Sequence, residues 1–166
     1  MSLDLPKLCE AIAAPGAVMR VVVAATRGSV PREAGAAMLV WQDGQEGTIG
    51  GGTLEWDATA RARALLAEGR SELMELPLGP ALGQCCGGHV TLALEYWDQA
   101  ALARVKEPVF ARPMGGVSTP PAPVRTAMAK AEAGLLHLPH LEGKWLVEST
   151  ASTGVPLWIW GAGHVG

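Results

Sequence analysis

The chain has no long apolar run, and its N-terminus lacks a basic segment followed by an apolar one. Its longest apolar stretches are far shorter than the roughly 20 residues that a transmembrane helix needs. The first residues also lack the pattern of a secretory signal peptide. We therefore expect no membrane partner and no membrane-spanning segment.

Dense positive charge is absent as well. Thirteen Lys and Arg residues stand against sixteen Asp and Glu residues, which gives a formal net charge of −3. Arg61 and Arg63 come nearest to a basic cluster, and their spacing predicts the solvated face of a helix. A basic patch is the electrostatic signature of a nucleic-acid-binding protein, so we expect no nucleic-acid partner.

Cysteine is rare, with only Cys9, Cys85 and Cys86 in the chain. An odd count with two neighbours in sequence is not a disulfide framework. Adjacent cysteines can bridge only through a strained ring, so reduced thiols in a reducing compartment are the simpler interpretation. We expect a cytoplasmic protein in which Cys9 is buried on the apolar face of a helix.

Apolar residues make up 49% of the sequence, which is enough for a sizeable core. The run Ala17–Thr26 is β-branched and nearly continuous, as in a strand buried on both faces. Alternation over His89–Tyr96 predicts another strand. Shorter strands are predicted at 38–41 and 73–76, and another short strand ends at Ile49. Helices are predicted at 5–12 and 53–68, and Thr53 is the predicted N-cap of the second helix. This pattern predicts an α/β fold with a mixed β-sheet and flanking helices.

Gly50, Gly51 and Gly52 stand between a predicted strand and a predicted helix. Glycines there let a ligand approach the backbone closely, and the free N–H groups of the first helical turn suit an anion such as a phosphate. A tight turn without a ligand explains the triplet equally well. Glu55 follows in the first turn, where a carboxylate complements the helix dipole.

Two further loops carry candidate ligand-binding side chains. Residues 27–35 form a Pro-stiffened loop in which Arg32 offers a planar fork that matches phosphate oxygens, although a solvated arginine is the plainer interpretation. Cys85 and Cys86 precede Gly87 and Gly88 in a Gly-rich loop whose amides could stabilise a thiolate. A thiolate is a soft ligand for a transition metal, but closed zinc coordination would need four ligands.

The chain after residue 100 changes character. Residues 101–156 are rich in Pro and Gly and predict a linker region. An apolar strand at 157–160 then runs into Gly161, Gly163 and Gly166, which match the dinucleotide-binding fingerprint. A dehydrogenase or reductase that uses NAD(P) through these glycines would explain the fingerprint but not the cysteine loop, and a regulatory nucleotide-binding domain would use only the glycine triplet.

Three segments, at residues 27–35, 47–55 and 82–88, together resemble the XdhC/CoxI family of xanthine dehydrogenase accessory proteins. Residues 157–166 are similar to the strand and glycine loop that open the family's Rossmann-type C-terminal domain. The resemblance implies an XdhC/CoxI-like N-terminal domain at 1–100, the linker region at 101–156, and a truncated Rossmann-type start at 157–166. Because the apolar strand at 157–160 would then lack its covering helices, we expect a homo-oligomer.

The resemblance further implies an accessory chaperone and not an enzyme. Such a protein would bind molybdenum cofactor (molybdopterin), aid its sulfuration and deliver it to xanthine dehydrogenase or a related molybdenum hydroxylase, with a cysteine desulfurase as a further partner. No catalytic residue is expected, and Cys86 is the expected ligand of the cofactor's molybdenum. The expected cofactor-binding residues are Arg32, Gly50, Gly51, Gly52, Glu55, Cys85, Cys86, Gly87 and Gly88.

Overall fold

The computed structural model describes residues 3–79, 87–115 and 119–150. A five-stranded sheet with the order β3-β2-β1-β5-β4 forms its centre, and each of its pairings is antiparallel. The strands are β1 (Ala17–Arg27), β2 (Ala37–Trp41), β3 (Gly44–Gly47), β4 (Glu72–Pro77) and β5 (His89–Asp98). The predicted α/β class with flanking helices is confirmed.

The two longest strands, β1 and β5, lie side by side at the middle of this sheet. They pair from Ala17 opposite Asp98 to Arg27 opposite His89, with one irregularity between Val23 and Ala25. The middle of each strand is buried, with seven consecutive buried residues in β1 and six in β5. The prediction of a strand buried on both faces is correct because separate layers of the molecule cover the two faces of β1.

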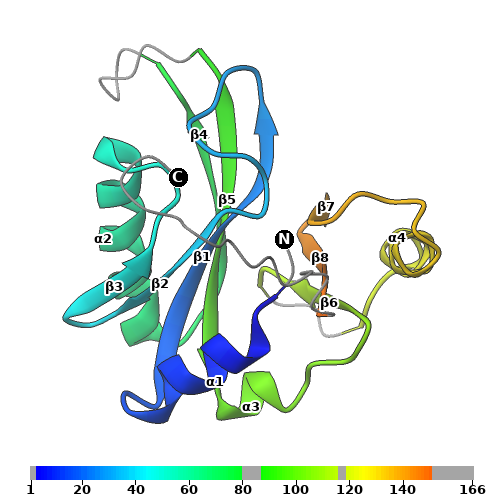
Figure 1. Ribbon diagram of the computed structural model, residues 1–166, viewed down its shortest axis with the longest axis horizontal. Helices are drawn as coiled ribbons and strands as arrows, with labels where there is room; N and C mark the ends of the chain where they lie inside the picture. The colour runs from blue at the N-terminus through cyan, green and yellow to red at the C-terminus, as the bar shows by residue number, and fades with distance from the viewer. Residues whose placement is uncertain (1–2, 80–86, 116–118, 151–166) are drawn as a thin grey trace, which may run out of the picture.

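Helix α2 (Gly52–Glu68) covers one face of the sheet, and a second small sheet lies on the other side (Figure 1). Ala58, Ala62 and Leu65 of α2 pack against strand residues such as Val21 and Leu92. The helix ends at Gly69, which adopts the left-handed conformation as the sequence predicted. The predicted N-cap is wrong: Thr53 lies inside the helix, and Gly51 occupies the cap position.

The second sheet has the order β6-β8-β7 and lies within the predicted linker region. It consists of β6 (Val109–Pro113), β7 (His140–Glu142) and β8 (Trp145–Ser149), and helix α4 (Ala122–Glu132) packs on it. Val109, Val124, Ala127, Trp145 and Val147 form its own apolar cluster. The Pro-rich composition predicted a linker here, but proline also suits the first turn of a helix, and one proline lies there in α4.

A third apolar cluster closes one end of the five-stranded sheet. Helix α1 (Leu5–Ala13) contributes Leu8 and Ile12, and the short helix α3 (Gln99–Leu102) contributes Ala101. The prediction that Cys9 is buried is wrong, because its side chain is exposed while those of Leu8 and Ile12 face the core. Among the described residues, no helix is long and apolar enough to span a membrane.

Candidate functional site

Two of the three motif loops are in backbone contact. A Cβ atom placed on Gly88 would lie 2.1 Å from the carbonyl oxygen of Ser29 and 2.8 Å from that of Arg27. A Cβ on Gly28 would lie 3.2 Å from the Cα of Gly88. The arginine loop and the Gly87–Gly88 end of the cysteine loop therefore touch where only glycine leaves room.

The glycine triplet joins the same assembly. A Cβ on Gly50 would lie 2.7 Å from the Cβ of Pro31 and 3.5 Å from the Cγ of Arg32. Gly50, Gly51 and Gly52 have φ values of +128°, +74° and +64°, a backbone region that other residues rarely adopt. Backbone conformation therefore favours glycine at all three positions, and the contact with the arginine loop requires it at Gly50 as well.

Glu55 holds the glycine turn together. Its carboxylate accepts hydrogen bonds from the backbone N–H groups of Ile49 at 3.0 Å and Gly51 at 3.1 Å, and from the Thr48 hydroxyl at 2.5 Å. Burial alone would raise the pKa of Glu55, but these donors together with Gln45 outweigh it and lower the pKa below the usual 4.5. Glu55 therefore acts as an internal anion for the turn, a more specific role than the dipole complement expected from its position.

Glu55 and Thr48 accept hydrogen bonds from some of the backbone N–H groups that were predicted to bind a ligand. The amide of Gly50 donates to the Thr48 hydroxyl at 3.1 Å, and that of Gly51 donates to Glu55. Within the described residues no side chain caps the start of α2, so the amides that follow Gly51 in the first turn are the donors free for an anion. Trp56, whose side chain is 73% exposed, lies in the same turn.

Arg32 lies beside this turn and is only loosely held. Its Nε atom is 3.9 Å from a carboxylate oxygen of Glu33, and the two side chains are 35% and 69% exposed. An exposed pair at that distance contributes little energy, so the guanidinium is free to meet an anion. The Cγ atom of Arg32 lies beside Gly50, so the base of this side chain is next to the glycine turn.

The structure thus brings together most of the predicted site residues: Arg32, Gly50, Gly51, Gly52, Glu55, Gly87 and Gly88. Cys85 and Cys86 lie outside the described residues, as do Gly161, Gly163 and Gly166. Within the described ranges, no group of three or more His, Cys, Asp or Glu side chains is placed to hold a metal ion.

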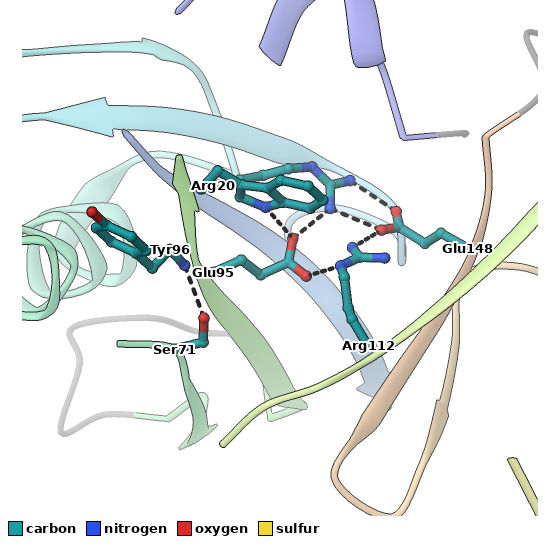
Figure 2. Close-up of polar contacts among 7 residues, drawn as sticks. Arg20, Ser71, Glu95, Tyr96, Arg112 and Glu148 are labelled. Atoms are coloured by element: carbon teal, nitrogen blue, oxygen red, sulfur yellow. Dashed lines mark hydrogen bonds and ion pairs between the residues drawn. The ribbon is translucent and has the colours of Figure 1, made fainter. Parts of the chain in front are cut away.

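A buried cluster of four charged residues was not anticipated. Arg20 of β1, Glu95 of β5, Arg112 of β6 and Glu148 of β8 meet between the two sheets, and none is more than 8% exposed (Figure 2). Arg20 binds Glu148 with two hydrogen bonds of 2.8 Å and Glu95 with a third. Arg112 bridges the same two carboxylates.

The four charges balance, so the cluster is electrically neutral. Burial alone would raise the pKa of Glu148, but Arg20 and Arg112 outweigh this and lower its pKa to about 2. The local sequence does carry a signal: Arg20, Glu95 and Glu148 each interrupt an apolar strand, and a charged group in a buried strand must be paired. The cluster joins the two sheets. Within the described residues, none of its hydrogen bonds between side chains reaches the three loops.

Comparison with known proteins gives two findings. Residues 11–77 match the model of the XdhC and CoxI family. A crystal structure from Bacillus halodurans, described as that of a xanthine dehydrogenase, is similar with a TM-score of 0.52 and 26% sequence identity over 61% of this chain. The match covers 32% of that protein, so the chain spans about a third of its length. No curated protein matched the chain.

Proposed function

We propose, on the basis of the XdhC and CoxI family segment at residues 11–77, that this protein serves in the maturation of a molybdenum hydroxylase of the xanthine dehydrogenase type. In this role it binds molybdenum cofactor, aids its sulfuration and hands it to the target enzyme. The described residues include no arrangement of nucleophile and base that would suggest a reaction of its own, so we propose a binding protein and not an enzyme.

The observation that carries the proposal is the contact of the three motif loops. The arginine loop touches Gly88, which is 60 positions from Gly28, and through Pro31 and Arg32 it also touches Gly50. Each close contact needs a glycine, and a loop assembly with this many special positions is typical of a ligand site on a rigid sheet. A purely structural turn would need one glycine and not three converging loops.

The residues present suit a phosphate-bearing cofactor. The uncapped amides at the start of α2 and the half-exposed guanidinium of Arg32 would hold the phosphate. Trp56 would offer an aromatic face to the pterin rings. Cys86, or else Cys85, would provide the thiolate for the metal. When bound, the cofactor supplies the molybdenum centre that the target enzyme uses.

Cofactor content tests this proposal directly. The protein is isolated from cells that make molybdenum cofactor, the released material is oxidised, and pterin fluorescence is measured. Fluorescent pterin supports the proposal. Bound nicotinamide would instead support the alternative of an NAD(P)-binding oxidoreductase, and the absence of pterin under conditions that load another molybdenum protein would overturn the proposal.

Arg32→Ala sharpens the test. Loss of a hydrogen bond to a charged group should weaken binding of the phosphate-bearing cofactor by about 1.5–3 kcal/mol and leave a dephospho form unaffected. Arg125→Ala, which removes an exposed arginine from α4, is the matched control. Equal weakening of both cofactor forms would show that Arg32 is not the phosphate partner.

The partners follow from the same role. We propose contact with the recipient molybdenum hydroxylase and with a cysteine desulfurase as the sulfur source. Co-purification of the loaded protein with each candidate, compared with the cofactor-free protein, measures whether the cofactor controls the contact.

A further inference from the structure

A cavity of about 500 Å³ lies between the β5 strand and the second sheet, away from the three loops. Tyr96, Trp97, Phe110 and Trp145 line it, together with Met114 and Met128. Pockets for small ligands have volumes of roughly 300–1,000 Å³ and mainly apolar and aromatic walls with a few polar groups. This cavity fits both criteria and shares no lining residue with the loop site.

Arg112 connects the cavity to the buried ion cluster. Its guanidinium carbon lies 5.5 Å from the ring centre of Trp97 and 5.6 Å from that of Phe110. Its Nε and Nη2 atoms bind Glu95 and Glu148. The buried Nη1 atom has no hydrogen-bond partner within the described residues, although Arg112 is only 8% exposed. Part of the wall therefore consists of two tilted aromatic rings in cation–π contact with a buried guanidinium.

The charges on the cavity wall are unequal. Arg104, Lys106 and Arg112 line it, against the single carboxylate of Glu95. That carboxylate is already bound by Arg20 and Arg112, with the Trp97 indole N–H at 3.4 Å. Glu107 follows Lys106 in the chain but does not line the cavity. Arg104 and Lys106 are exposed, and no carboxylate in the described part of the chain forms an ion pair with either of them, so they add two cations to the cavity wall.

We propose that this cavity binds a planar aromatic compound that carries a phosphate group, of the size of a nucleoside monophosphate. The aromatic rings of the ligand lie beside Phe110, Trp97 and Trp145, where offset or edge-to-face contacts are favourable, whereas the Tyr96 side chain packs on the other face of β5. The phosphate lies at Arg104 and Lys106, whose charges are not used elsewhere within the described residues. This site is independent of the proposed cofactor site.

Binding is tested on the whole chain with adenosine 5′-monophosphate as the probe and adenosine and inorganic phosphate as partial ligands. Isothermal titration calorimetry gives the affinities. We expect saturable binding of the monophosphate, at least about tenfold tighter than that of either partial ligand, since tenfold corresponds to about one charge-assisted hydrogen bond.

Three variants decide the location. Arg104→Ala combined with Lys106→Ala should weaken monophosphate binding at least about tenfold and leave adenosine binding unchanged. Lys130→Ala combined with Lys144→Ala removes two exposed cations outside the cavity and should change neither. Met128→Trp, which fills part of the cavity, should abolish binding of both. The proposal would be overturned by absence of saturable binding or by equal effects of the two double variants. Loss of binding in Arg32→Ala would also overturn it, because that result would place the monophosphate at the loop site.

Discussion

Gly88 lies so close to Ser29 that the space between them excludes even one methyl group. The position of a Cβ on Gly88 is 2.1 Å from the Ser29 carbonyl oxygen, and both partners are backbone. Leu78 holds Gly88 from the other side, through a 2.8 Å hydrogen bond from its amide to the Gly88 carbonyl. The arginine loop and the end of the cysteine loop are consequently fixed relative to each other.

Gly88→Ala is expected to separate the two loops. Backbone atoms cannot rotate away as a side chain does, so we expect a loss of stability of about 1–3 kcal/mol, the range for overpacking, together with weaker cofactor retention. Urea unfolding and pterin content provide the two measurements. Gly87→Ala is the matched control for stability, because a Cβ there meets nothing within 4 Å. Identical behaviour of the two variants would refute the contact.

Glu55→Ala should loosen the glycine turn. The substitution leaves the amides of Ile49 and Gly51 without their acceptor, and an unmade hydrogen bond of this kind costs about 1–3 kcal/mol. Glu55→Gln keeps one acceptor oxygen and should retain part of the stability. Amide chemical shifts of Gly50–Gly52 follow the turn directly, and unchanged shifts in Glu55→Ala would contradict the positioning role.

Glu148→Gln tests the buried ion cluster. The variant leaves Arg20 and Arg112 buried with one carboxylate between them, and removal of one partner from a buried ion pair typically costs about 3–5 kcal/mol. Glu46→Gln is the surface control: its 2.7 Å pair with Lys7 joins side chains that are 59% and 41% exposed, and should contribute about 0–1 kcal/mol. Denaturant unfolding compares the two, and similar losses would argue that the cluster is not the anchor between the sheets.

Acid should weaken the same cluster. The pKa of Glu148 is lowered from 4.5 to about 2 in the folded protein, so its unfolded state binds a proton more readily. Its contribution to stability is therefore complete above the unfolded pKa and is lost as the pH falls from about 4.5 toward 2. Melting temperatures over this range should fall more steeply for the parent protein than for Glu148→Gln, and parallel curves would contradict this assignment.

The two cysteines should differ in their effect on the cofactor. Cys86 stands directly before the Gly87–Gly88 pair, whose second member is fixed against Ser29. We expect Cys86→Ala to lower cofactor retention more than Cys85→Ala, measured as pterin content per protein. Unaltered retention in both variants would remove the thiolate from the proposed site.

Local patterns predicted the central strands because β1 carries a nearly continuous β-branched apolar run and β5 a regular alternation. They also predicted the end of α2, since Gly69 is a simple local signal. The N-cap of that helix was missed because Gly51 occupies the cap position with a positive φ angle and its amide donates to Glu55, an arrangement that is visible only in three dimensions. The three loops were each recognisable in the sequence, but their contact was not.

The second sheet was missed because its strands are short and its prolines look like those of a linker. Phe110 and Val147 lie in strands of five residues each, too short for a clear alternation. The ion cluster was missed for a different reason. Arg20 finds its carboxylates 75 and 128 positions further along the chain, and no local pattern reveals such partners.

Because of this separation, the partners of Arg20 are synthesised at different times. Arg20 leaves the ribosome early, whereas the strand that carries Glu148 is made 128 residues later. Until then the nascent chain holds a guanidinium with at most the Glu95 carboxylate, next to sheet residues such as Val22 and Ala93 that β8 has yet to cover. Docking of β8 is thus a late step that completes both the charge balance and the apolar cover at once. We also expect homologous proteins to keep all four charged residues or to replace them together, because loss of any one leaves an uncompensated charge buried between the sheets.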